Sequence, residues 1–301
     1  MKQLLLLILI TISIHSCKTT QQESKQHDKH QRITTNHITD LTPIITETSG
    51  LEYYKKQIIT HNDSGDSPTL YFLDTLGNLL YHKTYKNMTA IDWEDVTKDK
   101  EFLYIADIGN NYGDRKDLSI LKIALTDLQN EDATVTRLNI NYPNQKSFER
   151  GEQNHPYDAE SIVAIEENIY LFSKDWKDQT TIIYKLDKTK QRQIAQKITS
   201  YHIKGLVTGA TYDGTNTVTV CGYNNNLTPF IYKINYSNGE FEFLKKEELL
   251  IEGGAQVEGI ISIHNDRNKE TYYLSSEAAN IKLGEDEALT SSQLYKVMRF
   301  K

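Results

Sequence analysis

One short pattern recurs five times along the 301-residue chain, and it constrains the fold more than any other feature. A polar or acidic residue is followed by a small or polar residue and then by an apolar one. The copies are at 49–51 (SGL), 94–96 (EDV), 160–162 (ESI), 208–210 (TGA) and 258–260 (EGI). Their spacings are 45, 66, 48 and 50 residues. A period of this length indicates one supersecondary unit per repeat, stacked on its neighbours.

Two further strand-like segments follow each copy at nearly constant distances. The first series comprises IITHND, LYIAD, IYLFSKD, VTVCGYN and YYLSSE, and the second comprises LYFL, ILKI, IYKL, IYKI and LYKV. A fourth, weaker strand follows in four units, and helical periodicity is almost absent. Four strands in a period near 48 residues predict an all-β fold, a β-propeller of five four-stranded blades.

The ends of the repeat region bear on ring closure and on the number of blades. The fifth unit ends at Lys301 without room for a fourth strand, and the segment His37–Ile45 can supply it. Such a strand would close the ring and remove an exposed sheet edge. Six blades is the alternative, because the 66-residue second unit could hide another blade. Its excess segments, TDLQNEDATV and NQKSFERGEQNHPY, are more typical of loops.

The N-terminus predicts export and attachment to a membrane. Lys2 precedes an apolar run from Leu4 to Ile14, which is short for a bilayer span and typical of a signal peptide at 1–16. Ile14, Ser16 and Cys17 resemble a bacterial lipobox, although His15 is unusual there. We therefore expect lipid on Cys17, a polar disordered tether over 17–36 and the propeller over 37–301. No acid follows Cys17 at 18–20, which favours an outer-membrane lipoprotein that faces the periplasm.

Composition narrows the partners. The net charge is −7 and no basic stripe is present, so nucleic acid is disfavoured. Cys221, in an apolar strand, is expected to be a buried, inert thiol. We expect a monomer with an envelope protein or glycan as its partner.

Several motifs resemble a known group when taken in order: SGL, DWED, LYIADIGNN followed by an Arg, DAES, SKDW and VEGI. They resemble the secreted propellers of the SdiA-regulated and phytase-type esterase-like families, over about Glu47–Val297. The resemblance implies an exported bacterial β-propeller. It implies no reaction, because it supplies no catalytic residues to transfer to this chain.

Propeller geometry places the recurring triplets and the ends of the second strands on one face, around the channel mouth. Carboxylates there suit a hard cation such as Ca²⁺, and the candidate metal ligands are Asp63, Glu94, Glu160 and Glu258. The candidate ligand-binding residues are His61, Asp107, Asn110, Asn111, Arg115, Lys174 and Trp176. Alternatively, each acid accepts hydrogen bonds from the next blade, and repetition at equivalent positions favours that structural role.

Two functions of different classes follow. The first is a non-enzymatic module that binds a protein, peptide or glycan at the channel mouth. The alternative is a calcium-assisted hydrolase of phosphate or carboxylic esters, in which the cation acts as a Lewis acid. The chain has no G-x-S-x-G elbow, no zinc-ligand spacing and no glycine-rich phosphate loop. Hydrolysis needs an asymmetric set of groups, whereas these acids repeat evenly, so the binding module is the leading hypothesis.

Overall fold

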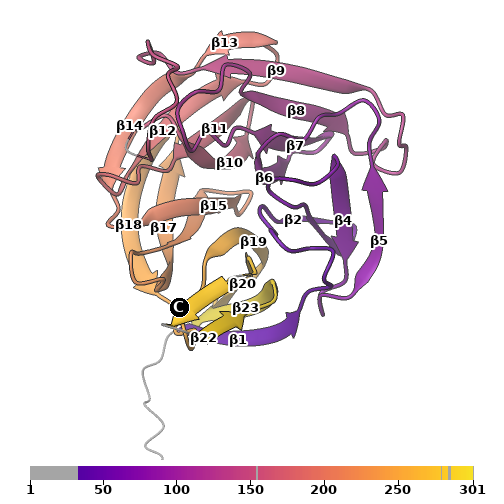
Figure 1. The fold of residues 1–301 in the computed structure, drawn as a ribbon, viewed down its shortest axis with the longest axis vertical. Coiled ribbons are helices and arrows are strands. Elements are labelled where there is room, and N and C mark those ends of the chain that lie inside the picture. Colours follow the sequence, from indigo (N-terminus) through magenta and orange to yellow (C-terminus); the bar gives the residue numbers. More distant parts are fainter. Residues whose placement is uncertain (1–32, 154, 279, 284–285, 301) are drawn as a thin grey trace, which may run out of the picture. The chain divides into compact units, whose positions relative to one another are not determined.

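Antiparallel sheets arranged in a ring make up the fold (Figure 1). The computed structural model describes residues 33–300, apart from 154, 279, 284 and 285. Over this range it contains 23 strands and no helix. The expected signal peptide, Cys17 and all of the expected tether before residue 33 lie outside the described residues. In the described range, no helix has the length and apolarity of a membrane span.

Each blade is a four-stranded sheet whose strands follow one another from the channel outward. Blade 1 contains β2 (Glu52–Tyr54), β3 (Gln57–Thr60), β4 (Thr69–Leu73) and β5 (Leu79–Thr84). Blade 2 contains β6 (Trp93–Lys98), β7 (Phe102–Asp107), β8 (Ser119–Ala124) and β9 (Val135–Asn141), with β13 (Arg192–Ile194) added outside β9. Blade 3 contains β10 (Ala159–Ile165), β11 (Asn168–Ser173), β12 (Thr180–Asp187) and β14 (Gln196–His202). Blade 4 contains β15 (Leu206–Tyr212), β16 (Thr217–Tyr223), β17 (Pro229–Ser237) and β18 (Glu240–Glu248). Blade 5 contains β19 (Val257–Asn265), β20 (Lys269–Ser276), β23 (Gln293–Phe300) and β1 (Ile33–Asp40), and β21 (Asn280–Leu283) pairs with β22 (Asp286–Leu289) as a separate hairpin.

The five-bladed prediction is confirmed, and the six-bladed alternative is wrong. The two excess segments of the second unit, 126–135 and 144–157, contain no strand apart from the first residue of β9. They are loops, as their composition predicted. The second of them leads into the innermost strand of blade 3.

The N-terminal strand closes the ring, as predicted, but with different bounds. β1 pairs antiparallel with β23, from Ile33 opposite Arg299 to Asp40 opposite Gln293. It therefore begins four residues before His37, and residues 33–36, which were expected in the tether, belong to the sheet. Beyond Asp40 the chain leaves the sheet, and Leu41 and Ile45 are buried in the core between blades 1 and 5.

The recurring triplet marks the place where neighbouring innermost strands approach most closely. A Cβ atom on Gly50 would lie 2.4 Å from the backbone nitrogen of Val96 in the next blade. A Cβ atom on Gly209 would lie 2.6 Å from the carbonyl oxygen of Glu258. The middle position of the triplet is therefore small in most blades because a neighbouring backbone fills the space that a side chain would need.

Apolar faces of adjacent blades make the core. Trp93, for example, is fully buried between blades 1 and 2 among Phe72, Leu103 and Leu121. Cys221 is buried and has no disulfide partner in the described part of the chain, and burial raises the pKa of its thiol. The placement of Cys221 confirms that it is a buried thiol, as expected.

We predict that deleting residues 33–45 abolishes cooperative unfolding or lowers the melting temperature strongly. The deletion removes the fourth strand of blade 5 and exposes the edge of β23. Thermal denaturation followed by far-UV circular dichroism measures the effect.

A circular permutant is the matched control. It begins at Thr46 and joins Lys301 to Ile33 through a short turn, which the pairing of Ile33 with Arg299 allows. It keeps all 20 blade strands and should melt near the parent temperature. A truncated protein that melted like the parent would contradict the closing role of β1.

Candidate functional site

A cavity of about 210 Å³ lies at the end of the channel where the innermost strands begin. All five blades contribute to it, together with the loop between blades 2 and 3. Its lining residues are Ser49, Asp63, Glu94, Asn111, Gln153, Glu160, Lys174, Trp176, Tyr223, Gln256, Glu258 and Glu277. We call this the acidic mouth. The four predicted metal ligands all line it, as do Asn111, Lys174 and Trp176.

The first position of the recurring triplet shows what a blade contact requires. Two blades have hydroxyl residues there, and both hydroxyls bond across to the next blade. Ser49 Oγ donates to the carbonyl oxygen of Glu94, and Thr208 Oγ1 donates to that of Val257 at 2.5 Å. A hydroxyl is therefore sufficient to connect neighbouring blades at this position.

Glutamate occupies the same position in the other three blades, as Glu94, Glu160 and Glu258. Glu94 and Glu258 are only 2% and 4% exposed. Among the described residues, no N–H or hydroxyl group donates to Glu94 Oε1 or Glu258 Oε2. A buried carboxylate without a donor is costly. Inter-blade contact therefore does not account for these two oxygens, although the Thr208 hydroxyl of blade 4 also interacts with the Glu258 carboxyl group.

Asp95, at the middle position of the triplet, does have the structural role. It is fully buried, and its Oδ2 accepts the backbone N–H of Ile162 in the next blade at 2.9 Å. Its Oδ1 accepts the N–H of Val96 at 2.8 Å. Both carboxylate oxygens are thus used by the fold, unlike those of Glu94.

Three carboxyl groups converge at one side of the acidic mouth. Asp63, Asp92 and Glu94 each present an oxygen within 4.8 Å of the other two. Burial, followed by the charges of Asp92 and Glu160, raises the pKa of Asp63 to about 10. Burial, followed by the charge of Asp63, also raises the pKa of Glu94 well above its usual value. Without a cation, the folded protein therefore favours protons on this group.

Lys174 is the cation that faces the cavity, and it already has a partner. Its Nζ lies 2.8 Å from Glu160 Oε1 and 4.8 Å from the centre of the Trp176 ring. Burial opposes its charge, but the surrounding carboxylates, Glu160 first, keep its pKa raised. One lysine cannot balance Asp63, Glu94, Glu258 and Glu277 as well as Glu160.

Arg115 is committed to its own loop. Its Nη2 donates to Asp107 Oδ1 and its Nη1 to the carbonyl oxygen of Gly109, both at 2.8 Å. Its Nε donates to Asp117 at 3.1 Å. Asn110 is also committed, since its side chain donates to the Tyr157 carbonyl and accepts the N–H of Arg115. Asp107, Asn110 and Arg115 therefore shape the loop that presents Asn111, and they do not line the cavity.

His61 also lies away from the cavity. It is fully buried, edge-on to Trp93 at 5.6 Å, and its Nδ1 lies 3.1 Å from the carbonyl oxygen of Asn62. Burial lowers its pKa to about 4, so the ring is neutral at neutral pH. It packs behind the site.

Several residues of the site, among them Asp92, Gln153 and Glu277, were not among the candidate residues of the sequence analysis. Asp92 lies two residues before the triplet that begins at Glu94. Glu277 is the last residue of its strand segment, as Asp63 and Asp107 are of theirs. The position of each acid in the repeat could therefore have identified it. Gln153 comes from the loop insertion, and its Nε2 donates to Asn111 Oδ1 at 3.0 Å. No repeat position could have identified it, because no other blade has this loop.

The donor set fits a hard divalent cation. Carboxylate and amide oxygens dominate the lining, and the described lining residues include no cysteine or histidine. Ca²⁺ takes such oxygens as ligands, whereas zinc sites usually use nitrogen or sulfur. The unpaired oxygens of Asp63 and Glu94, which converge with Asp92, are the atoms that a bound cation would satisfy.

No protein-family model and no curated protein matches the sequence. The comparison with solved structures does find similar folds. A glucose dehydrogenase superposes with a TM-score of 0.50 at 9% identity, over 87% of this chain and 98% of that one. A PQQ-bound aldose sugar dehydrogenase from Streptomyces coelicolor gives 0.49 at 10% identity, over 88% and 98%. Hydrazine synthase from Kuenenia stuttgartiensis gives 0.42 at 11% identity, over 79% and 58%.

At these identities, structural similarity carries information about the fold and not about the reaction. The resemblance to the SdiA-regulated and phytase-type families stays a prediction, since no family model matches. The likeness to the glucose dehydrogenase agrees with the ring of sheets described above: the chain has a β-propeller fold.

Proposed function

We propose that this protein is an envelope-anchored binding module whose acidic mouth holds a divalent cation, with calcium preferred. The cation would then engage an acidic group, carboxylate or phosphate, of an envelope protein, peptide or glycan. One observation carries the proposal. Buried oxygens of Asp63, Glu94 and Glu258 in a single cavity lack any N–H or hydroxyl donor among the described residues.

Calcium suits the site better than magnesium. It accepts six to eight oxygens in flexible geometry, whereas Mg²⁺ demands near-octahedral coordination and retains water. The cavity offers carboxylates from four blades together with the side-chain amides of Asn111, Gln153 and Gln256. Ligands so widely spread match the larger and more tolerant ion.

The rim of the cavity supports recognition of a further group. Trp176 is half-buried, and its indole N–H has no acceptor in the described part of the chain. Beside it, the Lys174 ammonium adds positive charge. An anion that bound the cation could therefore also accept a hydrogen bond from Trp176.

A calcium-assisted hydrolase of phosphate or carboxylic esters is the second candidate. Glu277 lines the cavity, and burial raises its pKa to about 7. A carboxyl group that titrates near neutral pH can serve as a general base. The binding module is preferred because Arg115 and Lys174 are already committed to carboxylates and His61 lies outside the cavity.

Attachment to the membrane forms the last part of the proposal. The apolar run before Cys17 and the lipobox-like residues around it support lipidation. The absence of an acidic residue at 18–20 supports a location of the lipoprotein on the periplasmic side of the outer membrane.

We predict that Ca²⁺ raises the melting temperature of the protein in chelator-treated buffer. Binding to the native state alone contributes about 2.7 kcal/mol at 100 times the Kd. Glu94→Gln should abolish most of this increase. It should itself stabilise the calcium-free protein by about 1 kcal/mol at pH 8, since it replaces an acid that folding must bury either charged or at the cost of taking up a proton. Differential scanning calorimetry with and without calcium measures both effects.

Glu240→Gln, at an exposed position, is the control and should leave the calcium response intact. No calcium response in the parent protein would refute the metal site. Turnover of a panel of phosphate and carboxylic esters that depends on calcium and on Glu277 would favour the hydrolase instead.

We also predict that the calcium-free protein becomes less stable as the pH rises from about 4 to 8. Burial raises the pKa of both Asp158 and Glu277 to about 7. A carboxyl group with a raised pKa in the folded state contributes stability at low pH, and this stability is lost as the pH passes its folded pKa. Urea denaturation in chelator across this range measures the change, and a saturating calcium concentration should reduce it. A stability that rose with pH in chelator would contradict the prediction.

Replacing Cys17 by Ser should release the protein from the membrane fraction and abolish palmitate labelling. The substitution removes the thiol that would carry the lipid. Cell fractionation measures the first effect and metabolic labelling the second. Retention of the variant in the membrane fraction would argue against a lipid anchor on Cys17.

A further inference from the structure

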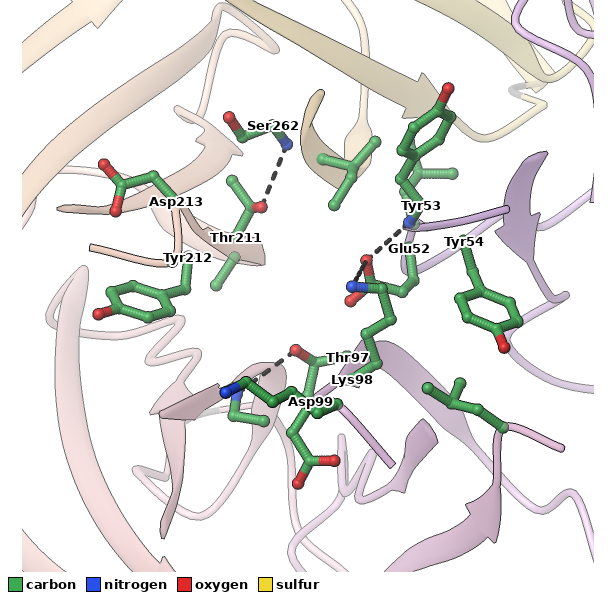
Figure 2. Close-up of a pocket in the computed structure, with 17 residues that line it drawn as sticks. Glu52, Tyr53, Tyr54, Thr97, Lys98, Asp99, Thr211, Tyr212, Asp213 and Ser262 are labelled. Carbon is green, nitrogen blue, oxygen red and sulfur yellow. Dashed lines mark hydrogen bonds and ion pairs between the residues drawn. The ribbon is translucent and has the colours of Figure 1, made fainter. Parts of the chain in front are cut away.

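A second, larger cavity of about 620 Å³ lies at the opposite end of the channel, where the innermost strands finish (Figure 2). Strands β2, β6, β10, β15 and β19 all contribute lining residues. Tyr53, Tyr54 and Tyr212 stand around its edge, and each is half-buried. We call this cavity the tyrosine mouth.

Glu52 departs from the repeat at this end. In two other blades a threonine connects the innermost strand to the next blade: Thr97 Oγ1 accepts the N–H of Ala164 at 3.4 Å, and Thr211 Oγ1 accepts that of Ser262 at 3.1 Å. Glu52 occupies the equivalent position in blade 1, where the backbone N–H of Lys98 is among the groups that act to lower the pKa of its carboxyl group. A threonine is therefore sufficient for the contact, and the carboxyl group of Glu52 exceeds what the fold needs.

That carboxyl group is costly where it stands. Glu52 is 7% exposed, and burial raises its pKa to about 7 against the opposing effect of Lys98. Its Oε1 accepts the N–H of Tyr53 at 2.7 Å, and Lys98 Nζ lies 3.8 Å from the same oxygen. Figure 2 shows the carboxyl group turned toward the middle of the cavity. A buried acid that the fold does not require, and that faces open space, marks a binding group.

The other acids of the cavity are occupied. Asp99 accepts from Lys188 at 2.9 Å and from the Tyr104 hydroxyl at 2.7 Å. Asp213 Oδ1 accepts three backbone N–H groups of the turn that follows it. Glu52 also has partners, the Tyr53 N–H and the Lys98 ammonium, but it is the acid that Figure 2 shows turned toward the middle of the cavity, and Lys98 balances its charge.

The available groups suit a neutral ligand with several hydroxyl groups. Thr97 and Thr211 each accept a backbone N–H, which leaves their hydroxyl protons free to donate. Lys98 is a further donor and Glu52 an acceptor, so donors and acceptors face one space. Each hydroxyl of a sugar can both donate and accept, and the tyrosine rings offer apolar faces to its carbon skeleton. A strongly charged ligand would meet an opposing charge from either Glu52 or Lys98.

The space extends beyond the tyrosine mouth. A cavity of about 500 Å³ shares Asp99 and Lys100 with it and continues along blades 2 and 3 past Phe102 and Glu167. The two cavities therefore adjoin at Asp99 and Lys100.

We propose that the tyrosine mouth is a binding site for a neutral saccharide, with Glu52 as its central hydrogen-bonding group. This site lies at the other end of the channel from the acidic mouth. It is independent of the cation proposed there.

Isothermal titration of the purified full chain with glucose, maltose, maltotriose, N-acetylglucosamine and N,N′-diacetylchitobiose tests the proposal. We expect binding of at least one of these sugars, with and without calcium. Glu52→Thr should weaken it by about ten-fold or more, because hydrogen bonds to charged groups are the stronger ones. Glu240→Gln, at an exposed acid that lines neither cavity, is the control and should bind as the parent does.

Glu52→Thr keeps the residue type that two other blades use, so it should melt at or above the parent temperature. A melting curve for this variant therefore separates loss of binding from loss of fold. The proposal is overturned if none of the five sugars binds, or if Glu52→Thr binds as well as the parent. It is also overturned if glycine, glutamate or inorganic phosphate binds in their place at this residue.

Discussion

The close approach of five innermost strands around one axis is the constraint on which the rest of the structure depends. Neighbouring backbones come so near at the recurring triplet that Gly50 and Gly209 have no room for a Cβ atom. Polar side chains then bridge from one blade to the next, as Asp95 does to Ile162 and Thr208 to Val257. These contacts hold neighbouring first strands together. They also deliver one side chain per blade to each end of the channel.

Such repetition separates structural from functional side chains. Ser49 and Thr208 make the contact with a hydroxyl. Glu94 and Glu258 at the same position each keep one buried oxygen to which no N–H or hydroxyl of the described residues donates. The same comparison applies at the other end, where Thr97 and Thr211 stand in the role of Glu52. Equivalent positions in different blades can thus be compared with one another, and the comparison shows where a buried acid is not needed for the fold.

The fold could be predicted almost completely from the sequence, because a blade is local and its strands recur in order. The bounds of β1 could not, since Ile33 is placed by pairing with Arg299 at the far end of the chain. The acidic mouth was predicted in outline, as Asp63, Glu94, Glu160 and Glu258 all line it. The structural role of Arg115 was not predicted. Its hydrogen bonds to Asp107, Gly109 and Asp117 depend on how the loop folds back on itself, which the sequence does not show. The tyrosine mouth was not predicted from the sequence. Glu52 stands out only once it is known that Thr97 and Thr211 occupy the equivalent position in two other blades.

Pairing of β1 with β23 has a consequence for the order in which the protein can fold. Ile33 and Arg299 are partners although 266 residues separate them. Closing so long a loop carries an entropic cost that local hairpins avoid, so blades 1 to 4 can form early whereas blade 5 must wait for both chain ends. During synthesis the first strand emerges long before its partner exists. The ring therefore stays open until the last strand has been made.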